Sequence, residues 1–234
     1  MIYQRYIKRI LDFSLSTVGL VILSPVYGIL VIAIKADSKG PILFKQKRVG
    51  IHKQHFNIYK FRTMSIDTPK DTPKDTPTHM LKNPDQYITK VGKFLRKTSL
   101  DELPQIFNII KGEMSIIGPR PALWNQEDLI AERDKYRAND VRPGLTGLAQ
   151  ISGRDELEIT IKAKLDGQYS DKLRSGGLKA AIFDCQCFLR TIFSVVRGDG
   201  VVEGETSKTH TSPLNSNNGD MIFEEDEYQT GAKK

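Results

Sequence analysis

The longest apolar run in the sequence spans residues 10–34. At 1.5 Å per helical residue, a run of this length can cross a hydrocarbon core about 30 Å thick. Asp12 is the only charged residue inside it, and lysines and arginines flank both ends. Because cationic flanks favour the cytoplasmic side of a membrane, we expect both ends of this helix to lie on that side.

A Ser24-Pro25 pair interrupts the apolar run. Pro25 has no N–H to donate to the carbonyl of Val21, and its ring crowds the preceding turn, so the helix should bend there. The Ser24 hydroxyl can satisfy the freed carbonyl. The pattern predicts a re-entrant helix-break-helix over residues 1–40. A kinked helix that crosses the bilayer once is the open alternative, because prolines are common in membrane helices.

Beyond this helix, apolar and polar residues alternate at 41–49 and 55–61, on either side of Gly50. This pattern predicts a β-hairpin. The sequence Asp-Thr-Pro then occurs three times, and prolines at this spacing exclude a helix. We therefore expect residues 65–84 to form an exposed loop.

Helical periodicity returns in residues 88–97 and 103–112, which predicts two short amphipathic helices. Residues 125–136 are mostly charged and predict a surface helix, and residues 141–154 are rich in turn formers and predict a loop with a short strand. An apolar repeat at 182–196 fits a helix lying in the membrane plane or, equally, a core helix.

Together these patterns predict an α+β fold with three parts. A re-entrant membrane helix (1–40) precedes a small, mostly helical cytosolic catalytic domain with a short β-hairpin and interfacial helices (41–198). The segment at 199–234 contains few apolar residues and predicts an acidic, flexible tail.

Charge narrows the choice of partners. The chain of 234 residues carries a net charge of +7, but residues 199–234 hold eight acidic residues and three lysines, so residues 1–198 carry +12. This excess favours anionic lipid headgroups or phosphorylated substrates. It does not favour nucleic acid, because the basic residues are not interleaved with aromatic ones. Cys185 and Cys187 are too close in sequence for a disulfide and predict buried structural thiols.

The adjacent carboxylates of Asp101 and Glu102 are the first candidates for chemistry. Pro104 places them at the start of the second amphipathic helix, where Asp101 could be an N-cap and Ser99 to Glu102 could form a capping box without any catalytic role. The same position allows a carboxylate to attack phosphorus if cations such as Arg96 screen the repulsion. Two adjacent acids could also hold Mg²⁺ together with substrate phosphate oxygens.

Six motifs occur together and in order: Lys8-Arg9-Ile10-Leu11-Asp12, Ser24-Pro25, Lys60-Phe61-Arg62-Thr63-Met64, Ser99-Leu100-Asp101-Glu102-Leu103-Pro104-Gln105, Gly118-Pro119-Arg120-Pro121 and Arg142-Pro143-Gly144-Leu145-Thr146-Gly147. With these motifs, residues 3–204 closely resemble the bacterial sugar transferases, monotopic phosphoglycosyl transferases, in the small form that is little more than the catalytic domain.

The resemblance implies an enzyme on the cytoplasmic face of the bacterial inner membrane. It would move a sugar-1-phosphate from a UDP-sugar to polyprenyl (undecaprenyl) phosphate, release UMP and use Mg²⁺. Asp101 would be the nucleophile of a covalent phosphosugar intermediate, Glu102 its partner in metal binding or proton handling, and Arg96 a phosphate contact. The substrate-binding residues that we expect are Lys60, Arg62, Pro119, Arg120, Pro121, Arg142, Gln150 and Arg154.

Two other interpretations stay open at this stage. The chain could be a non-catalytic membrane-bound scaffold in which Asp101 only caps a helix. It could also be a transferase in which Asp101 binds only the metal and the lipid phosphate attacks directly. The sequence does not identify the sugar, the glycan, the role of the Asp-Thr-Pro-Lys repeat or the oligomeric state, for which a homodimer is one option.

Overall fold

The structure is a computed structural model that describes residues 2–66, 86–153 and 157–197, with the side chains of 195–197 excepted. The chain divides into two units, Met1–Gly204 and Glu205–Lys234. The predicted tail at 199–234, most of the predicted loop at 65–84 and Arg154 lie outside the described residues. The first unit is helix-rich and holds two small sheets, as the predicted α+β class requires.

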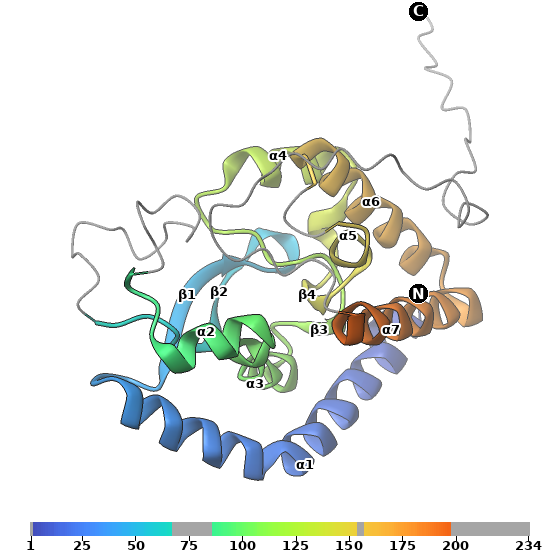
Figure 1. Ribbon diagram of the computed structural model, residues 1–234. Helices are drawn as coiled ribbons and strands as arrows, with labels where there is room; N and C mark the ends of the chain where they lie inside the picture. Colours follow the sequence, from blue (N-terminus) through green and yellow to red (C-terminus); the bar gives the residue numbers. More distant parts are fainter. Residues whose placement is uncertain (1, 67–85, 154–156, 198–234) are drawn as a thin grey trace, which may run out of the picture. The chain divides into compact units, whose positions relative to one another are not determined.

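Short helical turns and two-stranded sheets alternate with longer helices along the chain (Figure 1). The first half contains η1 (Tyr3–Ile7), α1 (Lys8–Asp37), β1 (Leu43–Val49), η2 (Ile51–Lys53), β2 (His55–Phe61), α2 (Lys90–Lys97), η5 (Leu100–Glu102) and α3 (Gln105–Lys111). The second half contains β3 (Ser115–Ile117), α4 (Glu127–Lys135), η6 (Ala138–Asp140), β4 (Gly144–Thr146), α5 (Leu148–Ile151), α6 (Ile159–Ser175) and α7 (Gly177–Arg197).

The strand pairing confirms the predicted hairpin. β1 and β2 are antiparallel, with Leu43 opposite Phe61 and Val49 opposite His55. β3 and β4 form a second, parallel pair. The predicted helices at 88–97 and 103–112 are confirmed as α2 and α3, and Gly112 ends α3 in the left-handed conformation (φ 87°), where the absence of a Cβ removes the strain.

The apolar run forms one helix, α1, with Pro25 inside it. The helix bends in its middle, so that two arms descend from the domain and meet below it (Figure 1). The Ser24 hydroxyl donates to the carbonyl of Val21 at 2.8 Å, which confirms the predicted replacement for the N–H that Pro25 lacks.

Polar contacts join the N-terminal arm of α1 to the domain. The guanidinium of Arg9 donates to the carbonyls of Ile109 (2.5 Å) and Ile110 (2.7 Å), which belong to the last turn of α3. The buried carboxylate of Asp12 accepts from the Ser115 hydroxyl at 2.7 Å and from the following backbone amide at 3.0 Å. Asp12, the one charge inside the apolar run, therefore fixes α1 to β3.

Asp184 of α7 forms a second buried junction at the start of the same arm. Its carboxylate accepts from the Tyr3 hydroxyl at 2.7 Å, from the Lys8 ammonium at 2.9 Å and from the Tyr169 hydroxyl at 2.8 Å. The negative charge of Asp184 is thus paired and hydrogen-bonded, as a buried carboxylate requires.

The C-terminal arm of α1 packs on the other side of α3. The Tyr27 hydroxyl donates to the carbonyl of Leu103 at 2.6 Å, and Asp37 accepts from the backbone amide of Val91 at 2.9 Å. Leu30 and Ile34 are buried in a cluster with Phe61 and Leu95, among others. Both arms of α1 are therefore attached to one domain.

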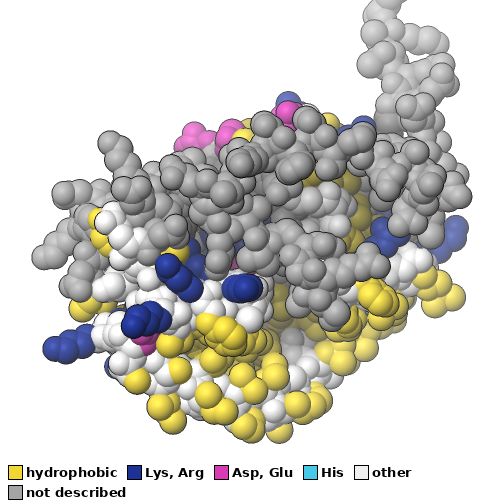
Figure 2. Space-filling model, in the orientation of Figure 1, with side chains coloured by type: hydrophobic (Ala, Val, Ile, Leu, Met, Phe, Trp, Pro, Cys, Tyr) yellow, Lys and Arg dark blue, Asp and Glu magenta, His cyan; other side chains and the backbone are white. Residues whose placement is uncertain are grey.

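The middle of α1 exposes its apolar side chains. Val21 and Ile22 are each 69% exposed, Ile29 is 67% exposed and Ile32 is 71% exposed. Among the described residues, Tyr3–Asp37 is the one helix long and apolar enough to cross a membrane. Apolar side chains gather along the lower edge of the molecule, where α1 lies (Figure 2). This surface indicates membrane association, because a buried core helix would cover these side chains.

Two helices depart from the predictions. The charged α4 is not wholly a surface helix, because Arg133 is buried and donates to Asp166 of α6 at 2.6 and 2.8 Å. α6 itself was not predicted, and α5 forms a single turn where we expected a loop. Cys185 and Cys187 are both free, as predicted, but only Cys187 is buried, so the prediction of two buried thiols is wrong for Cys185.

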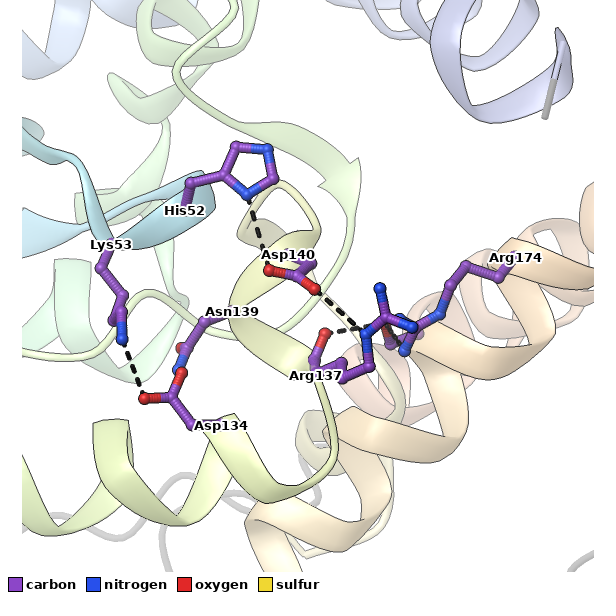
Figure 3. A network of polar contacts seen from close by, with 8 residues as sticks. His52, Lys53, Asp134, Arg137, Asn139, Asp140 and Arg174 are labelled. Atoms are coloured by element: carbon purple, nitrogen blue, oxygen red, sulfur yellow. Dashed lines mark hydrogen bonds and ion pairs between the residues drawn. The ribbon is translucent and has the colours of Figure 1, made fainter.

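Ion pairs on the surface hold the hairpin turn against η6 and the end of α4 (Figure 3). The ammonium of Lys53 lies 2.9 Å from Asp134, and the His52 Nδ1 lies 3.5 Å from Asp140, which also pairs with Arg137 at 3.4 Å. Such exposed pairs contribute roughly 0–1 kcal/mol each. They orient the turn more than they stabilise the fold.

Candidate active site

Asp101 and Glu102 lie in η5, a short 3₁₀ turn between α2 and α3. Ser99 has a left-handed backbone conformation (φ 56°), so the chain turns sharply where α2 ends. Pro104 directly precedes α3 at a position where its missing N–H removes no helical hydrogen bond. The turn therefore presents two successive carboxylates beside the hairpin strand β2.

The capping interpretation of these residues is wrong. Neither η5 nor α3 has a side-chain cap, so Ser99 and Asp101 do not receive the N-terminal amides of a helix. The Glu102 carboxylate does not bond back to Ser99, because two cations bind it instead. The chain needs neither carboxylate to begin α3.

Glu102 is held by Lys60 of β2 and by Arg120. The Lys60 ammonium donates to its Oε1 at 2.7 Å, and the Arg120 guanidinium donates to the same oxygen at 2.9 Å. Burial raises the pKa of Glu102, but the charges of Arg120 and Lys60 outweigh it, and the net pKa lies well below that of an ordinary glutamate. Glu102 thus stays ionised and fixes both cations.

Asp101 has the opposite electrostatic balance. Its side chain is 13% exposed and lies 3.8 Å from the Lys60 ammonium, and it makes no hydrogen bond with the described part of the chain. Burial raises the pKa of Asp101. The positive charges of Lys60, Arg96 and Arg120 lower this pKa, and the negative charge of Glu102 raises it. The sum of these effects is a raised pKa. A poorly solvated carboxylate that lacks hydrogen bonds is reactive as a nucleophile once it is ionised.

Arg96 lies at the end of α2, on the same side as Asp101. Its Nε donates to the Thr63 hydroxyl at 2.9 Å, which ties the guanidinium to the strand end that carries Lys60. Arg96, Lys60 and Arg120 therefore surround the two acids with positive charge. The structure brings these five predicted site residues together, and their roles stay predictions.

A cavity of about 260 Å³ opens beside Glu102 and Arg120. Apolar side chains from α3, β3, β4 and α7 form much of its wall, and Gln150 of α5 and Lys162 of α6 add polar groups. Gln150 is buried in this wall, so the structure brings it to the same cavity as Glu102.

Two predicted substrate-binding arginines lie elsewhere. The Arg62 guanidinium is buried and donates to the carbonyls of Ser38 (2.8 Å) and Lys39, so it secures the chain after α1. Arg142 donates to the carbonyl of Gly112 at 3.1 Å and lines a small cavity with Arg9. These contacts secure the C-terminal ends of α1 and α3, and the substrate-binding role predicted for Arg62 and Arg142 stays a prediction.

Pro119 and Pro121 position Arg120 through the backbone. The Pro119 carbonyl accepts from the Gly144 amide at 2.8 Å, and the Pro121 carbonyl accepts from Arg48 at 3.0 Å. The carbonyl of Arg120 itself accepts from Arg133 at 2.9 Å. The two prolines thus hold the turn, and their place in substrate contact stays a prediction.

Sequence reasoning missed Arg133. It stands in a run of charges that is typical of a solvated helix face, yet it lines the cavity and braces the turn of Arg120. Its partner Asp166 lies in the unpredicted α6, so the sequence offered no signal that the two charges meet.

The donor set suits a magnesium ion shared with a substrate. Among the described residues no group of three or more His, Cys, Asp or Glu side chains could enclose a metal. Mg²⁺ commonly uses one or two protein carboxylates and completes its shell with water and phosphate oxygens. The carboxylate of Asp101, which lacks hydrogen bonds, and that of Glu102 fit this requirement.

Comparison with known proteins identifies the family. The sequence profile of the bacterial sugar transferases matches residues 3–198. The chain belongs to this family. The match covers both the apolar helix α1 and the domain that holds the carboxylates.

Three relatives illustrate the similarity. The UDP-glucose:undecaprenyl-phosphate glucose-1-phosphate transferase of Klebsiella pneumoniae is 39% identical over 171 residues, 69% of this chain and 34% of that protein. The undecaprenyl-phosphate galactose phosphotransferase of Salmonella typhimurium is 38% identical over 177 residues, 71% of this chain and 37% of that protein. The exopolysaccharide production protein ExoY of Rhizobium meliloti is 36% identical over 173 residues, 69% and 76% respectively.

This bacterial sugar transferase spans about a third of the length of the first two relatives and about three quarters of ExoY. The names of the first two share the lipid phosphate and differ in the sugar.

Proposed function

We propose that this bacterial sugar transferase moves a sugar-1-phosphate from a UDP-sugar to undecaprenyl phosphate and releases UMP. The observation that carries the proposal is the buried carboxylate of Asp101, which has no hydrogen bond to a described residue and lies among three cations. The names of the two transferase relatives support the lipid acceptor, and the first also names a UDP-sugar donor.

Asp101 acts as the nucleophile in a two-step transfer. Its ionised oxygen forms a bond to the β-phosphorus of the UDP-sugar while the bond from that phosphorus to the bridging oxygen breaks, and UMP leaves with the electron pair. An oxygen of undecaprenyl phosphate then attacks the same phosphorus and displaces Asp101. The product is a polyprenol diphosphate sugar, and the carboxylate is regenerated.

The cations lower the barrier by holding negative charge. Lys60 lies close enough to both acids to screen their repulsion of an incoming diphosphate. Arg120 reaches Glu102 from the segment between β3 and α4. A bound Mg²⁺ would neutralise charge on the diphosphate oxygens. Glu102 keeps Lys60 and Arg120 in place; its lowered pKa makes it a poor proton donor near neutral pH.

The membrane topology that we propose is re-entrant. Both arms of α1 bind the same domain, and the exposed apolar side chains lie between them, so one face of the bilayer can hold both ends. The cationic flanks favour the cytoplasmic face of the inner membrane, where UDP-sugars are made.

Release of UMP tests the proposed transfer. Purified protein in nanodiscs is mixed with undecaprenyl phosphate, Mg²⁺ and either UDP-glucose or UDP-galactose, and UMP is measured. We expect turnover by the wild type and by the control Asp171→Asn, whose exposed carboxylate lies on α6. We expect none from Asp101→Asn. Turnover by Asp101→Asn at the wild-type rate would support the direct-attack interpretation instead, and no turnover by the wild type would support the scaffold interpretation.

A further inference from the structure

The cavity beside Glu102 contains a buried amide that no described residue pairs with. Gln150 is 7% exposed, and neither its Oε1 nor its Nε2 has a hydrogen-bond partner among the residues that the structure describes. Asn108, a fully buried amide close by in the fold, is saturated: it accepts from the Tyr59 amide and donates to the Asn57 carbonyl and to Glu113. Gln105 also has an unpaired Nε2, but it does not line the cavity.

A buried amide with both polar atoms unpaired is unfavourable unless a ligand makes the missing hydrogen bonds. The ligand must offer one donor and one acceptor side by side, since the amide of Gln150 presents an acceptor and a donor in one plane. The ligand must also fit apolar walls, which include Ile106, Ile116, Leu145 and Phe188.

These two requirements disfavour two parts of the proposed substrates. A polyprenyl chain would fit the apolar side chains but would leave both amide atoms unpaired. A sugar ring could pair with the polar lining, which includes Arg133, Thr146 and Lys162, but it offers no flat apolar faces to the apolar side chains. A pyrimidine base offers flat apolar faces to the walls, and one edge of uracil carries an N3–H between two carbonyl oxygens.

We propose that Gln150 binds the imide edge of the uracil base of the donor nucleotide. Its Oε1 accepts from N3–H, and its Nε2 donates to an adjacent carbonyl. The inference rests on the proposed function, which supplies the UDP-sugar. With the base beside α5, the diphosphate extends toward Glu102 and Arg120 at the other wall of the same cavity.

Methylation of the uracil N3 removes the N3–H group from which the Oε1 of Gln150 should accept a hydrogen bond. We expect a UDP-sugar with 3-methyluracil to lower kcat/KM of the wild type by about 10- to 100-fold, mainly through KM, as for the loss of a buried hydrogen bond. Gln150→Leu should lower kcat/KM for the unmodified donor to a similar extent. In that variant the methyl group should have almost no further effect, because the two changes remove the same contact.

Gln126→Leu, at the start of α4, is the control and should show the full methyl effect. Gln150→Glu keeps an acceptor and loses the donor, so it should retain part of the methyl effect. The absence of a methyl effect in the wild type would overturn the proposal, and that result needs no variant. The proposal would also be overturned if the methyl group lowered kcat/KM equally in the wild type and in Gln150→Leu. A Gln150→Leu variant that changed only the preference between glucose and galactose donors would overturn it too.

Binding of free UMP and 3-methyl-UMP, measured by calorimetry, separates this inference from the proposed function. If the protein binds UMP more tightly than 3-methyl-UMP only when Gln150 is present, the base site stands even if no sugar phosphate is transferred. Equal binding of the two nucleotides to the wild type would remove the base site even if transfer occurs.

Discussion

Asp101 and Glu102 are adjacent in the sequence and have opposite electrostatic environments. Glu102 shares one oxygen between two cations and has a lowered pKa. Asp101 is desolvated, has no hydrogen bond within the part of the chain that the structure describes, and has a raised pKa. Pairs of titratable groups with pKa values shifted apart are typical of sites where each carries a different role. Here one carboxylate organises the site and the other is available to react.

Lys60 should control the acid limb of the pH profile. In the proposed mechanism only ionised Asp101 attacks, so the first step slows as the pH falls through its pKa. Lys60 is the largest influence that lowers this pKa. Lys60→Met should therefore move the acid limb of kcat/KM to higher pH. Lys93→Met, on the solvent side of α2, is the control. An unshifted limb in Lys60→Met would show that a different group limits the rate.

Asp101 should also oppose folding at neutral and alkaline pH. Below the ordinary aspartate pKa, both the folded and the unfolded chain hold the proton and Asp101 contributes nothing. Above the raised folded-state pKa, the ionised carboxylate is less favourable in the folded chain than in the unfolded one. Asp101→Asn should therefore have a higher Tm than the wild type at pH 8, and the difference should shrink as the pH is lowered toward the ordinary aspartate pKa. A lower Tm at pH 8 would contradict this balance.

At the scale of elements, the sequence was most informative where one periodicity dominates. Alternation located the hairpin, and three- and four-residue spacing located α2 and α3. The sequence did not predict α6, because the buried face of this helix carries Asp166, Gly167 and Ser170 among its apolar residues. These residues interrupt the helical pattern of apolar positions. Buried polar residues that pair with distant partners cannot be recognised from local sequence.

In the candidate site, too, the sequence predicted some residues and could not predict the placement of others. The carboxylates and the proline-flanked Arg120 could be predicted because turn formers and adjacent charges mark them. Arg62 and Arg142 could not be placed, since an arginine that caps carbonyls has the same local sequence as one that binds phosphate. Gln150 could be named as a site residue but not explained until the cavity showed its unpaired amide.

The topology of α1 can be tested at both of its ends. Tyr3 is a poor labelling site because it is buried, whereas Ile2 is 71% exposed and the Lys39 side chain is exposed after the second arm. In a Cys185→Ser background, Ile2→Cys and Lys39→Cys should both resist an impermeant maleimide in intact cells and react in inverted vesicles. Labelling of either residue in intact cells would mean that α1 spans the bilayer.

At the scale of the whole unit, apolar surface and positive charge act together. α1 exposes its central apolar residues, and α7 exposes Leu178, Ile182, Leu189 and Phe193. Residues 1–198 carry a charge of +12, which favours anionic headgroups. A domain attached in this way would keep its carboxylates near the membrane that holds the proposed lipid acceptor.

α7 should lie at the membrane interface. With Trp124→Phe as background, Phe193→Trp should be quenched by brominated lipids in nanodiscs, because this side chain is 64% exposed on α7. Asp171→Trp, on the exposed side of α6, should be quenched much less. Equal quenching at the two positions would assign α7 to the aqueous surface.

The central claim is that Asp101 becomes bonded to phosphorus. The direct measurement is incubation of the protein with a UDP-sugar labelled with ³²P at the β-phosphate, without lipid acceptor, followed by rapid denaturation and mass analysis of the peptide that contains residue 101. The account predicts a labelled phosphosugar on this peptide in the wild type and in Asp171→Asn, absent in Asp101→Asn and discharged by undecaprenyl phosphate. Turnover by the wild type without any labelled peptide on this time scale would contradict it.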